Sequence, residues 1–168
     1  MDTKDEIKQY LLDLENDETQ VRNIARHKLA GIGPEAVPDL IQQLKTDRER
    51  CRWEAAKILG DIPDNEAAVE ALVEALMDNS INVHWVATES LIKHGQNAIL
   101  PLLEGITRHF DSMRFRQGAY HVLHMLERLH HLDPEIQDVL DALRSIEPSV
   151  SAPWAAERAI EHIKFGKK

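Results

Sequence analysis

One short apolar segment occurs five times along this chain of 168 residues. The copies begin at Val21, Cys51, Val83, Phe115 and Ala152; the first four are 30 or 32 residues apart, and the last follows a longer spacer. A period of this length is typical of solenoids, in which each repeat can cover its apolar face only with its neighbours. The spacing therefore predicts a stack of similar units around one continuous core.

The stretches between these copies also share a pattern. Each has apolar residues at positions i, i+3, i+4 and i+7, which form one stripe along a helix. The stripes span residues 7–14, 37–44, 69–76, 99–106 and 136–143. We therefore expect ten helices in five antiparallel pairs. The approximate repeats are 3–32, 33–62, 63–95, 96–132 and 133–165, in a single domain over residues 1–168.

The recurring residues resemble those of HEAT repeats. Arg22, Ala25 and Leu29 in the first copy return as Arg52, Ala55 and Leu59 in the second, which ends in Gly60, and residues 35–41 supply the apolar helix before the second copy. The pattern is most similar to the short HEAT-like repeats of the phycobilin-lyase type. This resemblance implies an all-α fold, a right-handed α-α superhelix, and a family that consists mostly of interaction scaffolds. Function still has to be argued from the site.

An aspartate followed by an arginine recurs at the turn inside the repeats. The pairs are Asp17 with Arg22, Asp47 with Arg52 and Asp111 with Arg116; the third copy has Asp78 and His84, and the fifth has Pro153 in place of the arginine. The resemblance implies that such pairs tie neighbouring repeats together. Arginine and a carboxylate can form two parallel hydrogen bonds, which suits a row of stacked turns. We expect these residues to be structural, and a pH-sensitive link at His84 is a further hypothesis.

All three tryptophans stand at the same position of the copies. Trp53, Trp85 and Trp154 each follow the first residue of a copy by two, and Asn23 and Gln117 fill this position elsewhere. At about 100° per residue, the position lies nearly opposite the side that the repeated apolar residues would bury. The resemblance places the second helix of each pair on the concave side of the solenoid. The tryptophans are therefore expected to face a groove.

The expected groove surface consists of two rows of residues. One row is Asn23, Trp53, Trp85, Gln117 and Trp154, and the other is His27, Lys57, Glu89, His121 and Arg158. Either the tryptophans anchor a partner, or they lie across the neighbouring helix and complete the packing between repeats. Anchor residues of interfaces are enriched in tryptophan and commonly cost about 2 kcal/mol or more on truncation. We favour partner contact, and a half-buried indole can serve both roles.

Charge and composition narrow the choice of partner. The formal net charge is −9, which repels phosphate backbones and argues against nucleic acid. No apolar run approaches the ~20 residues of a membrane span, and residues 1–6 do not resemble a signal peptide. We therefore expect a cytoplasmic protein without membrane contact, and the oligomeric state stays open. Cys51, the only cysteine, is expected to be a buried small apolar residue.

The nine histidines raise the hypothesis of a metal site, because His121, His124 and Glu127 share one helical face. We favour a polar helix face without a metal. Hydroxylases built from HEAT repeats need paired His-Glu dipeptides, and this sequence contains none. A Gly-rich phosphate loop and a recognisable nucleophile with its base are absent from the sequence as well.

Together these patterns favour a non-catalytic scaffold that binds a protein or peptide in its concave groove, without a cofactor. The alternative is an accessory or lyase-like factor that acts on a protein-bound tetrapyrrole. A third hypothesis is a metal enzyme at the histidine-rich fourth repeat. A bilin-type ligand would shift visible absorbance and quench tryptophan fluorescence, which distinguishes the second hypothesis from the first.

Overall fold

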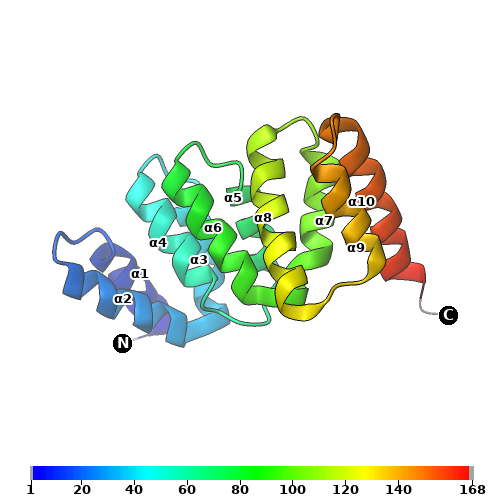
Figure 1. Ribbon diagram of the computed structural model, residues 1–168. Helices are drawn as coiled ribbons and strands as arrows, with labels where there is room; N and C mark the ends of the chain where they lie inside the picture. The colour runs from blue at the N-terminus through cyan, green and yellow to red at the C-terminus, as the bar shows by residue number, and fades with distance from the viewer. Residues whose placement is uncertain (1, 167–168) are drawn as a thin grey trace.

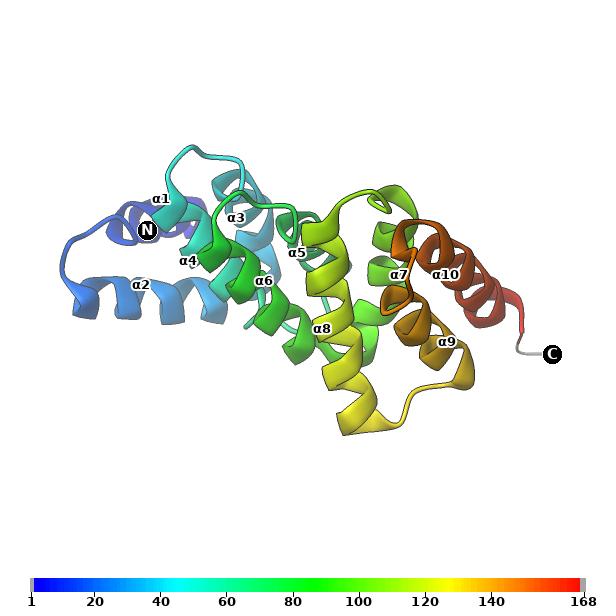
Figure 2. The ribbon, with the colours of Figure 1, turned by 45° about the horizontal axis from the view of Figure 1, so that its top comes forward.

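The computed structural model describes residues 2–166, and the regular structure in this range is entirely helical. Its α-helices are α1 (Thr3–Asp13), α2 (Thr19–Ile32), α3 (Val37–Gln43), α4 (Glu49–Leu59), α5 (Glu66–Ala75), α6 (Ile81–His94), α7 (Ile99–Arg108), α8 (Met113–His130), α9 (Pro134–Leu143) and α10 (Pro148–Phe165). Successive helices form five pairs, which are stacked from one end of the molecule to the other (Figures 1 and 2). The predicted all-α solenoid is thus confirmed.

Local sequence signals explain where several helices begin and end. The side chains of Asn65, Ser80 and Ser112 accept hydrogen bonds from backbone N–H groups in the first turns of α5, α6 and α8. Gly33 ends α2 with φ 73°, and Gly95 ends α6 with φ 60°. Both angles lie in the left-handed region that favours glycine. A short 3₁₀ turn then leads directly into the next helix, α3 or α7.

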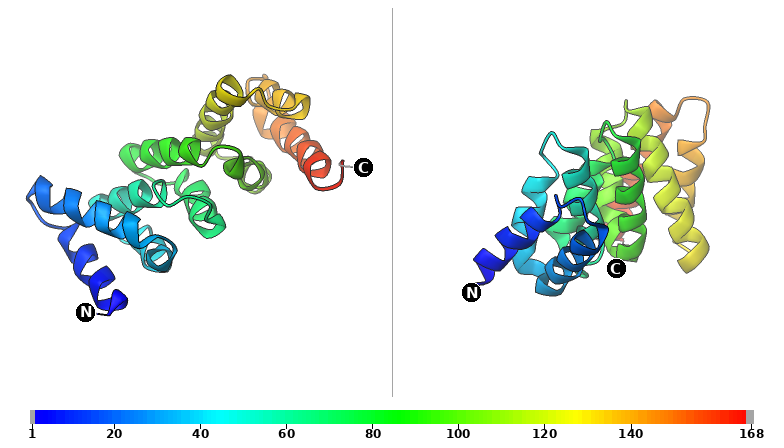
Figure 3. Two further views of the ribbon diagram at one scale, coloured as in Figure 1. Left: turned by 90° about the horizontal axis from the view of Figure 1, so that it is seen from below. Right: turned by 90° about the vertical axis from the view of Figure 1, so that its left-hand side faces the viewer.

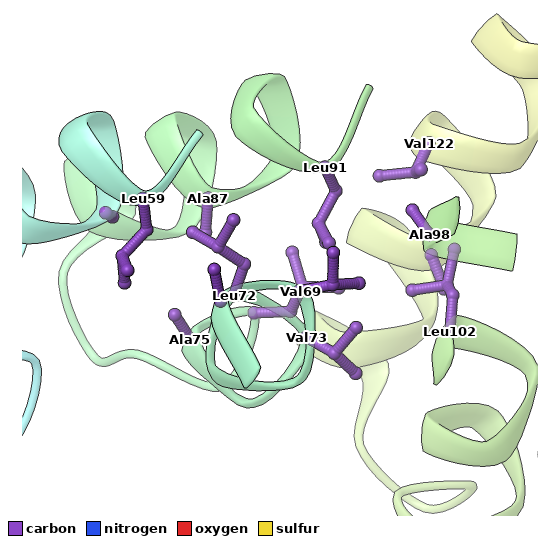
Figure 4. Close-up of a cluster of buried hydrophobic side chains, with 14 of the residues drawn as sticks. Leu59, Val69, Leu72, Val73, Ala75, Ala87, Leu91, Ala98, Leu102 and Val122 are labelled. Carbon is purple, nitrogen blue, oxygen red and sulfur yellow. The ribbon is translucent and has the colours of Figure 1, made fainter. Parts of the chain in front are cut away.

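The core is a continuous row of aliphatic side chains between the helices of each pair. Figure 4 shows Leu59, Leu72, Leu91, Leu102 and Val122, which come from five successive helices and point toward one another. All five are fully buried. Burial of one such side chain contributes about 1.5–3 kcal/mol, so the stacking of neighbouring pairs supplies most of the stability of each pair.

Helices α2 to α8 form two layers. The first helices pack side by side in the order α3, α5, α7, and the second helices pack in the order α2, α4, α6, α8. Figure 3 shows the two layers along the array. We call them the first-helix layer and the second-helix layer.

The last pair exchanges these layers. α10 packs against α7, the first helix of the preceding pair, and α9 packs against α8. In Figure 3, α9 accordingly continues the second-helix layer, and α10 continues the first-helix layer. Trp154 belongs to α10 and therefore lies in the other layer from Trp53 and Trp85. The structure differs here from the expectation that all five copies form one stripe.

Two local features accompany the exchange. α8 has 18 residues, whereas α4 has 11 and α6 has 14, so the chain leaves α8 beyond the ends of the other second helices. It turns at His131, whose backbone is left-handed with φ 49°. The residues that α10 buries are all alanines, namely Ala152, Ala155, Ala156 and Ala159. Small side chains allow neighbouring helix axes to come close, so α10 can lie against both α7 and α9.

Candidate functional site

Trp53 is half-buried and takes part in the packing between α2 and α4. The guanidinium carbon of Arg26 lies 5.5 Å from the centre of the indole. The same guanidinium donates two hydrogen bonds to Glu54, from Nε to Oε2 at 2.7 Å and from Nη2 to Oε1 at 3.2 Å. Because the Glu54 side chain is buried, this bidentate pair satisfies a carboxylate that would otherwise be costly to bury. The indole thus covers a structural ion pair.

Trp85 is 46% exposed, although its ring is closely supported. The rings of His84 and His121 both contact it, each edge-to-face with a centroid distance of 5.4 Å. His84 is buried, and its Nδ1 donates a hydrogen bond to the carbonyl oxygen of Leu76 at 2.9 Å. A ring that packs against two neighbouring rings loses little freedom on binding a partner.

Two exposed apolar residues lie at the starts of α6 and α8, the helices that carry Trp85 and His121. Ile81 stands one helical turn before Trp85 on α6, and Met113 is the first residue of α8. Arg114 fixes the start of α8 beside the start of α6, because its Nη1 donates to the carbonyl oxygen of Asp78 at 2.6 Å. We call Ile81, Trp85, Met113 and His121 the Trp85 surface.

Sequence analysis missed Ile81 and Met113 as members of this surface. Both stand four residues before the tryptophan position of their copies, so they share its helical face. The i−4 spacing was a usable signal for both residues. Their exposure depends on the neighbouring helices and becomes evident only in the fold.

The other residues of the expected groove divide between the layers. Asn23 and His27 are exposed on α2, where His27 Nδ1 lies 2.7 Å from the backbone oxygen of Asn23. On the neighbouring second helices, Lys57 is half-buried, and Glu89 and Gln117 are exposed. The remaining two, Trp154 and Arg158, lie on α10 in the first-helix layer. Trp154 is 68% exposed, and Arg158 Nη2 lies 3.8 Å from Asp138 of α9.

Arg52, which was expected with Asp47 of its own turn, instead forms an ion pair with Asp78 across a repeat boundary. Arg52 donates from Nε to Asp78 Oδ2 at 2.7 Å and from Nη2 to Oδ1 at 3.1 Å. The hydrogen bonds to Asp78 raise the pKa of the Arg52 guanidinium above its ordinary value. This bidentate pair joins α4 to the turn before α6.

The other arginines of the set bind backbone oxygens at their own turns. Arg22 Nη1 donates to the carbonyl oxygens of Asn16 at 2.7 Å and Asp17 at 2.8 Å, and Arg116 donates to that of Phe110. The carboxylates of Asp17, Asp47 and Asp111 are exposed, and Arg50 lies 3.5 Å from that of Asp17. His84 takes the arginine position of the third repeat, where its partner is the Leu76 carbonyl.

A shallow hollow lies between α4 and α6 beside Trp53. It has a volume of about 400 Å³ and is lined by Glu49, Arg50, Trp53 and Asn82. The Asn82 amide donates to Glu49 Oε1 at 2.9 Å, and this hydrogen bond lowers the pKa of the Glu49 carboxyl. The hollow therefore offers a carboxylate that is ionised at neutral pH next to a cationic side chain.

Larger hollows lie on the first-helix layer. One of about 690 Å³ lies between α5 and α7, and another of about 490 Å³ lies between α3 and α5. Both are lined by Glu70, and Glu104 closes one end of the first through a 2.7 Å ion pair with Lys164 of α10. Their carboxylates give these hollows a negative potential that repels phosphate groups. The groove was expected on the second-helix layer. These larger hollows lie on the first-helix layer instead, and Lys164 of α10 lines one of them.

Histidines and carboxylates do not converge on a metal-binding geometry in residues 2–166. In that range no three His, Cys, Asp or Glu side chains form a group that could hold a metal ion. His124, one of the candidate ligands, instead stacks on Tyr120 with a centroid distance of 5.5 Å. None of the helices in the described range is both long and apolar enough to cross a bilayer.

Comparison with known proteins adds one finding. The HEAT repeats family matches residues 7–92, which are 86 of the 168 residues. The matched stretch includes both Trp53 and Trp85, and it ends before α7. No curated protein matches the chain.

Proposed function

The chain belongs to the HEAT-repeat family, and from that premise we propose that it is a non-catalytic scaffold that binds a protein or peptide on its second-helix layer. HEAT repeats generally mediate protein interactions. In this proposal the Trp85 surface is the main contact, and Lys57 and Glu89 set specificity beside it. Trp53 contributes at the edge, and Trp154 takes no part, because α10 lies in the other layer.

The observation that carries the proposal is that Trp85 is exposed and yet held by neighbouring rings. Its indole is nearly half exposed to solvent and packs against two histidine rings. Binding hot spots are enriched in tryptophan, and a side chain that is already ordered gives up less entropy on association. Ile81 and Met113 add exposed apolar area at the starts of α6 and α8. A partner segment with one or two apolar side chains would bury this area.

Peptide selection provides a direct test. A displayed library of random peptides would be selected on the immobilised protein, and the best peptide, labelled with a fluorophore, would be titrated with wild-type and Trp85→Ala protein. We expect Trp85→Ala to raise the Kd about 30-fold, since truncation of an anchor commonly costs about 2 kcal/mol. Anisotropy of the label measures both constants.

Trp154→Ala is the matched control, because it removes an even more exposed indole from a different face. We expect the Kd of this variant to stay within about twofold of the wild type, the scatter expected for a distant surface change. Equal Kd values for Trp85→Ala and the wild type would contradict the proposal. A larger loss in Trp154→Ala than in Trp85→Ala would contradict it as well.

The resemblance to phycobilin-lyase repeats leaves the tetrapyrrole-dependent factor as the alternative. We expect the visible spectrum of biliverdin to stay the same when the protein is added. We also expect biliverdin to leave the tryptophan fluorescence of the protein unquenched. The reason is electrostatic: the two hollows between α3, α5 and α7 both carry Glu70, and the propionates of a bilin would meet like charge there. A saturable shift in absorbance with matching quenching would favour the alternative.

A further inference from the structure

We propose that the outward face of α10 is a self-association surface, through which two copies of this chain pair in an antiparallel, two-fold arrangement. This goes beyond partner binding at the Trp85 surface and uses a different helix. The proposal starts from the large apolar side chains that α10 exposes. Trp154 is 68% exposed, Val150 is 55% exposed and Phe165 is 75% exposed.

These three residues share one face of the helix. The buried alanines 152, 155, 156 and 159 define the inner face of α10. At about 100° per residue, Val150, Trp154 and Phe165 point to the opposite side. Glu157, Arg158 and Glu161 fall on the same outward side and are exposed. Exposed apolar area of this kind, rimmed by charges, is typical of an interaction site.

The order of residues on this face is complementary to itself. In an antiparallel pair with its two-fold axis between Glu157 and Arg158, each Glu157 lies opposite the Arg158 of the second copy. The same register places Val150 opposite Phe165 and Trp154 opposite Glu161, so that the indole N–H can donate to a carboxylate. Every contact occurs twice, as an isologous interface requires. A face that matches itself in this way favours a second copy as the occupant.

The charges at the centre are free to make these contacts. Arg158 has a long contact of 3.8 Å to Asp138, with both side chains largely exposed. Exchange of this contact for one with Glu157 of a second copy therefore costs little. The two ion pairs would fix the direction and register of the helices, and the apolar contacts would supply most of the affinity.

The apolar area on the outward face of α10 is large enough for a weak dimer. Aromatic side chains bury about 150–250 Å² each, so the tryptophan and phenylalanine of two copies supply up to about 600–1,000 Å². With the valines, this reaches the roughly 1,000 Å² that a specific interface needs. We therefore expect dissociation in the micromolar range and a mass that depends on concentration.

Sedimentation equilibrium of the full chain over a range from low micromolar to near millimolar tests the proposal. We expect the wild-type mass to rise from 19.2 kDa toward twice that value. Trp154→Ala should stay monomeric over the same range. Ile24→Ala, which removes an exposed apolar side chain from α2, is the matched control and should associate as the wild type does. Circular dichroism confirms that each variant is folded.

A charge exchange tests the antiparallel register itself. Arg158→Glu should abolish association, because four glutamates would then face one another at the axis. The double variant with Glu157→Arg and Arg158→Glu should associate again, since both ion pairs are rebuilt with the charges exchanged. A wild type that stays monomeric at every concentration would overturn the proposal. So would a Trp154→Ala protein that still dimerises, or a double variant that stays monomeric.

Discussion

Trp53 and Trp85 occupy the same position of consecutive second helices but have different neighbours. Trp53 packs against the guanidinium of Arg26, which is bound to the buried Glu54. Trp85 contacts two histidine rings and keeps nearly half of its surface in solvent. The first set of contacts is structural, and the second leaves the indole free for a partner.

Single alanine substitutions should separate these two roles. Trp53→Ala should lower the free energy of unfolding by about 2 kcal/mol, because it removes a partly buried indole and exposes the ion pair beneath. Trp85→Ala should lower it by less than about 1 kcal/mol, the usual range for a surface change. Urea denaturation followed by circular dichroism measures both. Equal losses, or a larger loss for Trp85→Ala, would contradict this assignment.

Cys51 allows a prediction about reactivity. The thiol is buried, and burial together with the nearby Glu15 carboxylate raises its pKa. Because the thiolate is the reactive form, the native protein should react slowly with iodoacetamide at neutral pH. In denaturant the rate should rise to that of a free cysteine. Mass spectrometry of timed samples measures the rates, and rapid labelling of the native protein would disagree with the structure.

At the level of whole elements, a bidentate ion pair connects the second repeat to the third. Arg52 on α4 holds Asp78 before α6 through two hydrogen bonds, with both side chains largely buried. Asp78→Asn keeps the shape of the residue but removes its charge and one of the two acceptor oxygens. We expect a loss of about 1–3 kcal/mol in unfolding free energy, because the guanidinium loses a charged partner.

Asp111→Asn is the control for this change. Asp111 holds the equivalent turn position of the fourth repeat, where its side chain is exposed. The same substitution there should leave stability unchanged within about 0.5 kcal/mol. Thermal or urea unfolding compares the two variants directly. Similar losses at both positions would show that the Arg52 contact is not the cause.

The helices themselves could be predicted from the sequence because their signals are local. The stripe in residues 69–76 and glycines such as Gly95 are read within one or two turns, and they match α5 and the end of α6. The layer of α10 could not be predicted in this way. It depends on contacts between α10 and α7, which are about 50 residues apart in the chain. Trp85 and Trp154 therefore share one position of the repeat, although α6 lies in the second-helix layer and α10 in the first-helix layer.

At the scale of the whole molecule, the chain has three surfaces of different character. The second-helix layer carries the Trp85 surface, the first-helix layer carries hollows lined by glutamates, and α10 exposes a face rich in apolar residues. With a net charge of −9, the molecule repels polyanions as a whole. We therefore favour apolar contact at the Trp85 surface as the form of recognition.

Quenching of single tryptophans in the presence of the selected peptide tests the central claim most directly. One protein would retain Trp85 alone, with phenylalanine at positions 53 and 154, and a second would retain Trp154 alone. At concentrations too low for self-association, the peptide should at least halve the acrylamide quenching of Trp85 and leave that of Trp154 unchanged. Protection of Trp154, or unchanged quenching of Trp85 when the peptide is bound, would contradict binding on the second-helix layer.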